Sequence, residues 1–152
     1  MGSLLFLVNC SSQNSFSLTD VDYRQKLVKT QKAILYKDKQ TKAILTATYS
    51  NSFDDMNGTN ERFVVTLYID NDSNNSWSDA YHLTLNGKKP ISIKKLKSDD
   101  KLLSNISFKN EWKNYYFVDF PSVGNKQMYM IFGDNKQEIK LYFTKKAKYL
   151  YK

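Results

Sequence analysis

RFVVTLYI (residues 62–69) is the clearest strand in the chain. Its apolar residues recur at every second position, so a β-strand would place them on one face of a sheet. They are Phe63, Val65, Leu67 and Ile69. The segment is also rich in β-branched and aromatic residues, which favour strands. It therefore predicts a strand with one face in a hydrophobic core.

Similar short segments lie on both sides of it. They cover residues 33–36, 43–49, 81–85, 91–96, 115–120, 128–132 and 139–143. Turn-forming residues separate several of them, at 37–40, at Asn86-Gly87 and at Gly133-Asp134-Asn135, and these positions predict hairpins. Seven or eight short strands without alternating helices predict an all-β, antiparallel β-sandwich. An immunoglobulin-like topology is the expected subclass from strand number alone, because the Cys-Trp-Cys spacing is absent.

The start of the folded domain has two readings. Thr19 or Asp20 would cap a short helix that runs to about Lys29. The same residues also alternate in the manner of a strand, and short segments of this kind fit either structure. We expect one domain over residues 19–152, a normal size for a single core.

Composition excludes several classes of function. The 152 residues are 41% hydrophobic and carry a net charge of +8, but only two of the 23 basic residues are arginine. Arginine is the better side chain for planar contacts to phosphate and bases, so this balance argues against a dedicated nucleic-acid binder. One cysteine allows no intrachain disulfide, and one histidine leaves no ordinary zinc set. We expect no enzyme activity and no cofactor.

The N-terminus carries a distinctive pattern. Residues 4–8 are apolar, Cys10 is the only cysteine, and the polar segment Ser11-Ser12-Gln13-Asn14-Ser15 follows it. This pattern resembles the end of a bacterial lipoprotein signal peptide, with Leu7-Val8-Asn9-Cys10 on the four lipobox positions.

The resemblance implies that Cys10 carries diacylglycerol and becomes the new N-terminus. Residues 1–10 would then be the signal-peptide part and 11–18 a flexible tether. The expected location is periplasmic or cell-surface, on a bacterial membrane. The open alternative is that residues 4–8 form a buried strand and Cys10 is a small buried side chain.

Two acidic loops are candidate sites. Asp70, Asp72, Asn74 and Asp79 place oxygen ligands at spacings that would suit calcium. Their alternative role is a polar loop whose side chains bond their own backbone, and this reading is favoured. Asp54, Asp55 and Glu61 would offer paired carboxylates for hydrolysis, but we read them as a solvated loop.

The remaining candidates are aromatic, basic or histidine side chains. We expect Trp77, Lys94, Lys95 and Lys97 to contact a partner. His82 is expected to be a satisfied, half-buried strand residue rather than part of a triad. Lysines also form two groups, and tyrosines alternate with the second of them toward the C-terminus, which would suit single-stranded nucleic acid. The favoured reading is a solvated surface with lysines guarding edge strands. The two groups are Lys88, Lys89, Lys94, Lys95, Lys97 and Lys140, Lys145, Lys146, Lys148, Lys152, with Tyr142, Tyr149 and Tyr151.

The sequence thus predicts a non-enzymatic, lipid-anchored envelope protein that binds an envelope protein or polymer. The first alternative is a basic β-module that binds nucleic acid, and the second is a secreted calcium-binding or hydrolytic domain.

Overall fold

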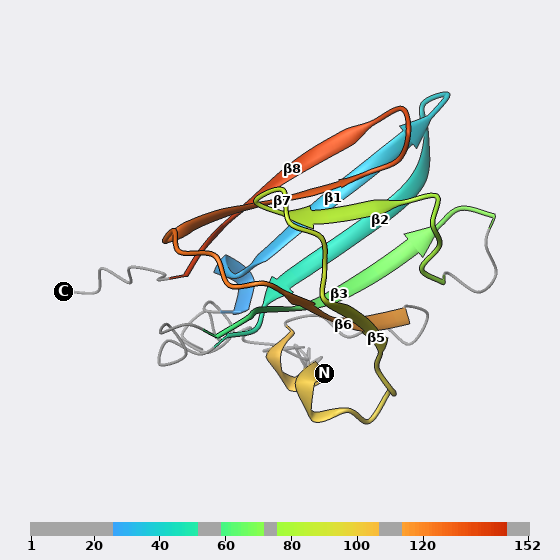
Figure 1. The fold of residues 1–152 in the computed structure, drawn as a ribbon. Coiled ribbons are helices and arrows are strands. Elements are labelled where there is room, and N and C mark those ends of the chain that lie inside the picture. The colour runs from blue at the N-terminus through green and yellow to red at the C-terminus, as the bar shows by residue number, and fades with distance from the viewer. Residues whose placement is uncertain (1–25, 52–58, 72–75, 107–113, 146–152) are drawn as a thin grey trace, which may run out of the picture.

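A computed structural model of the chain describes residues 26–51, 59–71, 76–106 and 114–145. Within these ranges the chain forms eight strands and one 3-10 helix (Figure 1). They are β1 (Thr30–Lys37), β2 (Gln40–Tyr49), β3 (Glu61–Ile69), β4 (His82–Leu85), β5 (Ser92–Lys95), the 3-10 helix η1 (Lys101–Asn105), β6 (Asn114–Phe120), β7 (Gln127–Gly133) and β8 (Glu138–Thr144). All eight predicted strands are confirmed. Within the described part of 19–29, residues 26–28 form a single helical turn ahead of β1.

The strands form two antiparallel sheets. One has five strands in the order β1-β2-β3-β6-β5, and the other has three in the order β4-β7-β8. If the strands from β2 to β8 are lettered A to G, the orders become A-B-E-D and C-F-G, which is the constant-type immunoglobulin arrangement. β1 is an additional edge strand beside β2. The predicted immunoglobulin-like sandwich is therefore confirmed, with one extra strand.

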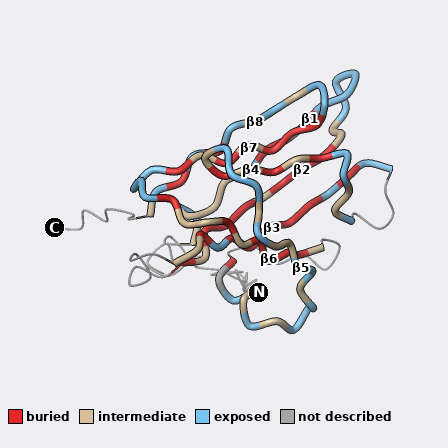
Figure 2. The backbone as a smooth tube through the Cα atoms, in the orientation of Figure 1, coloured by how far each residue is buried: buried red, intermediate tan, exposed pale blue. Residues whose placement is uncertain are grey.

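The core lies between the sheets (Figure 2). The predicted inner face of β3 is buried, and Phe63 is fully buried on it. The ring of Phe63 lies 5.0 Å from that of Phe143 in β8 and 5.8 Å from that of Phe120 in β6. Because Cys10 is the only cysteine in the chain, no disulfide joins the sheets, and packing of this kind holds them together.

Two tight turns follow the predicted chemistry. Asp38 and Lys39 connect β1 to β2 with positive φ angles of 50° and 66°. Asn86 and Gly87 also have positive φ, which glycine adopts without steric cost, and Leu85 pairs with Lys88 across them.

The hairpin that we expected at Asn86-Gly87 is nevertheless wrong. β4 pairs with β7, whereas β5 pairs with β6, so the chain leaves the turn and crosses to the other sheet. Turn residues fix a local reversal only, and the next strand goes where its apolar side chains are buried.

Helix η1 covers part of the outer face of the five-stranded sheet. Leu103 and Ile106 pack there on Val64 of β3 and Tyr115 of β6, and these residues form a second, smaller core. The Asp100 side chain caps the helix by accepting a hydrogen bond from the Leu102 amide at 2.9 Å. This sheet thus has buried residues on both faces.

On one side of the sandwich, β8 runs beside β1 (Figure 1). The carboxamide of Gln137 bonds both the amide and the carbonyl of Tyr36 in β1. A side chain thus supplies the pairing that a neighbouring strand would give, and it blocks this part of an otherwise open sheet edge.

Candidate functional site

The outer face of the three-stranded sheet carries a pair of tyrosines, of which Tyr142 is exposed and Tyr129 is half-buried. In β7, Met128, Met130 and Phe132 point into the core, so the residues between them point outward. Tyr129 in β7 lies directly opposite Tyr142 in β8 in the strand register. Tyr142 is 67% exposed, the largest value among the large apolar side chains of the described residues.

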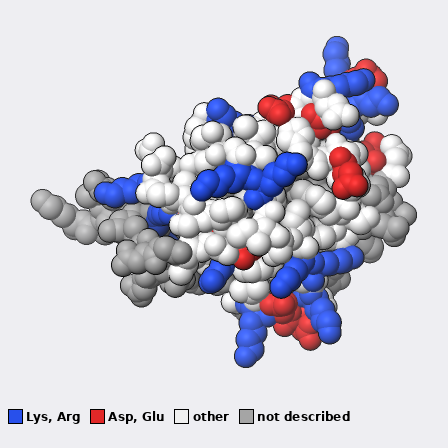
Figure 3. Space-filling view, in the orientation of Figure 1, with Lys and Arg blue, Asp and Glu red and all other residues white. Residues whose placement is uncertain are grey.

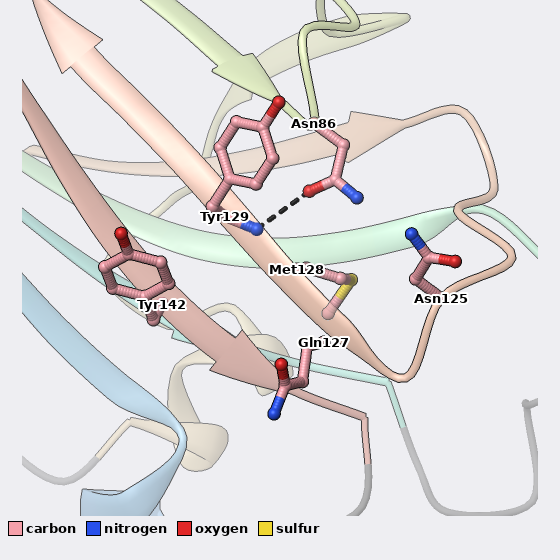
Figure 4. Close-up of a pocket in the computed structure, with 6 residues that line it drawn as sticks. All are labelled: Asn86, Asn125, Gln127, Met128, Tyr129 and Tyr142. Atoms are coloured by element: carbon pink, nitrogen blue, oxygen red, sulfur yellow. Dashed lines mark hydrogen bonds between the residues drawn. The ribbon is translucent and has the colours of Figure 1, made fainter.

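These tyrosines line an open hollow of about 410 Å³ (Figure 4). Asn86, Asn125 and Gln127 form its polar side, and Met128 contributes to its floor. The described residues that line it carry no charge. Its volume is within the roughly 300–1,000 Å³ range of small-molecule sites. The arrangement combines aromatic surface with neutral hydrogen-bonding groups.

Asn86 fixes the position of Tyr129. Its backbone amide donates to the Tyr129 carbonyl at 2.8 Å, and its side-chain oxygen accepts from the Tyr129 amide at 2.8 Å (Figure 4). Both backbone groups of Tyr129 are therefore satisfied by one residue. The turn that follows β4 is thereby tied to the middle of β7, and the hollow is built on paired strands.

Lys140 supports Tyr129 from the side away from the hollow. It lies opposite Ile131 in the register, whereas the hollow is on the Gln127 side of Tyr129. Its ammonium is 4.7 Å from the centre of the Tyr129 ring. A cation at this distance is attracted to the face of the ring. This charge therefore restrains the aromatic side chain without lining the hollow.

Two ion pairs join the sheets, one at each end of β2. At the end that carries Tyr49, the Lys145 ammonium lies 2.5 Å from the Glu61 carboxylate. The Tyr49 hydroxyl and the Val123 amide also donate to that carboxylate, at 2.8 and 2.9 Å. Glu61 is only 1% exposed, so our reading of it as part of a solvated loop is wrong. Burial is possible because each carboxylate oxygen is satisfied.

At the other end, Lys42 of β2 pairs with Asp134, which follows β7, at 2.5 Å. The hydrogen bond from Lys42 lowers the pKa of the Asp134 carboxyl to about 2, and the backbone amides of Lys136 and Gln137 act in the same direction. The same hydrogen bond raises the pKa of the Lys42 ammonium. Lys42 also lines a second hollow, of about 310 Å³, with Tyr81 and Asp70.

The acidic residues predicted for calcium are only partly described. Asp70 is exposed and accepts a hydrogen bond from the neighbouring Asn71 side chain at 2.7 Å, and Asp79 is also exposed. Asp72 and Asn74 lie outside the described residues. Over the described ranges, no three His, Cys, Asp or Glu side chains come together as a metal site. Asp54, Asp55 and Cys10 also lie outside these ranges.

The residues predicted to contact a partner are placed apart from the tyrosine pair. Trp77 is half-buried, packs against the main core and meets the Tyr116 ring edge-on at 6.0 Å. Its contact with a partner stays a prediction. Lys94 and Lys95 are exposed on β5, the edge strand of the five-stranded sheet, and Lys97 follows them. Lysines on an edge strand discourage pairing with another chain.

His82 behaves as predicted. It is half-buried on β4, and its Nε2 lies 2.8 Å from the Glu138 carboxylate on the same outer face. On the face shown in Figure 3, the cationic side chains lie in several separate groups, with carboxylates among some of them. The described lysines thus form no continuous basic surface on this face.

Tyr129, Asn125 and Gln127 were not predicted as site residues. Asn86 was predicted only as a turn residue, and Tyr142 only as one of the tyrosines among the C-terminal lysines. The sequence does contain a signal for Tyr129, namely which of the alternating residues in this strand face the core and which face outward. Once Met128, Met130 and Phe132 are assigned to the core, an aromatic residue between them must face outward. The alignment of Tyr129 with Tyr142 depends on the strand register.

No family model matches the chain, and neither a curated protein nor a solved structure shows significant similarity to it. The strand order places the fold in the class of antiparallel β-sandwiches with an immunoglobulin-like arrangement, to which β1 adds an edge strand. In the described part of the chain, none of the helices has the length and apolar character needed to span a bilayer.

Proposed function

We propose that this protein is a non-enzymatic, lipid-anchored module of the bacterial envelope, periplasmic or at the cell surface. The sandwich presents the tyrosine pair and the hollow beside it to a partner. Tyr142 supports a binding role because exposed aromatic side chains contribute strongly to recognition.

The sequence Leu7-Val8-Asn9-Cys10 is the observation that carries the anchor. A diacylglycerol-modified cysteine holds a domain by its acyl chains, and each buried methylene contributes roughly 0.8 kcal/mol. Residues 11–18, which begin with the polar segment Ser11-Ser12-Gln13-Asn14-Ser15, would act as the tether between the anchor and the domain.

The charged side chains support binding rather than catalysis. Within the described ranges, Glu61 with Lys145 and Lys42 with Asp134 connect the two sheets. The carboxylates of both pairs are buried and hydrogen-bonded, which is the arrangement of a structural pair. The hollow beside Tyr129 and Tyr142, in contrast, is lined by described residues that are all neutral, and none of these is a general base or an activated nucleophile.

Mass spectrometry of the intact protein tests the anchor. The gene is expressed from its native locus, and the chain is purified from the membrane fraction beside a Cys10→Ser control. We expect a mature chain that begins at Cys10 and carries diacylglycerol and an acyl group, whereas the control stays unmodified. An unmodified wild-type chain in the soluble fraction would refute the anchor.

A further inference from the structure

The hollow beside Tyr129 and Tyr142 has the chemistry of a carbohydrate site. Tyr142 is two-thirds exposed on a regular strand, although its ring could be buried if it faced the core. Tyr129 lies directly across from it, so the two rings share one face of the sheet. Such surface suits a ligand with a flat apolar side.

The polar residues of the lining indicate which class of ligand the hollow would bind. Asn86, Asn125 and Gln127 offer carboxamides, which both donate and accept hydrogen bonds. Carboxamides pair well with hydroxyl groups, because hydroxyls also donate and accept hydrogen bonds. A sugar ring combines hydroxyls at its rim with an apolar C–H face, and it carries no charge.

The placement of charge argues against a polyanion. Sites for single-stranded nucleic acid combine aromatic platforms with cationic grooves along the backbone. The Lys140 ammonium contacts the ring of Tyr129, but it lies on the side of Tyr129 that is away from the hollow. Strand addition by a peptide beside Tyr129 is also disfavoured, because Asn86 already occupies both backbone groups of Tyr129 on the side of β7 that faces β4.

We propose that this hollow binds a short segment of a neutral oligosaccharide, with Tyr142 and Tyr129 packing on its sugar rings. The inference rests on the proposed function, since it names the polymer that the anchored module would hold. The volume of about 410 Å³ limits the contact to a small part of any longer glycan.

Calorimetry and NMR titration of the full chain test the proposal. The Cys10→Ser variant keeps the chain free of lipid, and the probes are cellotetraose, maltotetraose and chitotetraose. We expect saturable binding of at least one of them, with amide shifts centred on β7 and β8. Tyr142→Ala should weaken that binding about tenfold, the size expected for an aromatic anchor. Tyr142→Phe keeps the ring and should retain binding within about twofold.

Tyr68→Ala is the matched control, because Tyr68 is a partly exposed tyrosine on the outer face of the other sheet. It should leave binding unchanged. The proposal is overturned if none of the three sugars binds, or if Tyr142→Ala leaves the affinity unchanged. Binding of a short oligothymidylate at the same tyrosines, with steep salt dependence, would overturn it in favour of nucleic acid. An anchored chain that binds no sugar would refute this inference alone, whereas an unanchored chain that binds sugar would refute only the anchor.

Discussion

The two outer faces of this sandwich are used differently. On the five-stranded sheet, Val64 and Tyr115 are covered by Leu103 and its neighbours, so outward-facing apolar residues become a second core. On the three-stranded sheet, Tyr142 remains exposed beside a hollow with neutral lining. The same alternation of side chains thus gives added stability on one face and a recognition surface on the other. What differs is whether a later segment of the chain folds back over the sheet.

The largest expected effect concerns the ion pair between Lys145 and Glu61, which joins the two sheets. Lys145→Ala leaves the Glu61 carboxylate buried without its cation, and breaking a buried pair in this way should lower the free energy of unfolding by about 3 kcal/mol. Urea unfolding measures this loss. Lys88→Ala is the control, because the Lys88 ammonium is exposed and bonds the Ser122 carbonyl, so its loss should cost less than about 0.5 kcal/mol. Equal effects of the two changes would show that the Glu61 pair does not join the sheets.

The covered face should respond to truncation more than the open face. Leu103→Ala removes a buried side chain from the second core and should cost about 2 kcal/mol, at the low end because the short helix can relax. Tyr142→Ala should change stability by less than about 0.5 kcal/mol, since the ring is mostly exposed. Both values follow from the same unfolding experiment. A comparable loss in Tyr142→Ala would mean that this ring serves folding.

The smallest expected effect concerns the ion pair between Lys42 and Asp134. The pKa of Asp134 is lowered to about 2 in the folded protein, so its contribution is complete above the unfolded pKa and is lost as pH falls from about 5 toward 2. Asp134→Asn should therefore lose stability at neutral pH, by about 1 kcal/mol because Lys42 is one-third exposed and solvent screens the pair. The difference from wild type should vanish in acid.

Unfolding curves over this pH range check the prediction. The matched control is Asp79→Asn, which changes an exposed carboxyl and should unfold as the wild type does at each pH. A constant difference between Asp134→Asn and the wild type at all pH values would contradict the assigned role of this carboxylate.

Local patterns in the sequence were sufficient for the strands and most of the turns. The alternation in residues 62–69 correctly predicted which side chains of β3 enter the core, and Asn86-Gly87 correctly marked a reversal. The same reading misplaced the strand that follows this turn and treated Glu61 as solvated. Both errors concern contacts between residues that are distant in the chain.

The sequence by itself determined an all-β domain, the positions of its eight strands and the face of β3 that enters the core, because side-chain alternation is a local property of an extended backbone. Only the tertiary structure decided that β4 and β5 belong to different sheets, that Lys145 reaches Glu61 and that Tyr129 meets Tyr142. Strand pairing depends on the competition of all apolar faces for one core, and no short segment contains that information.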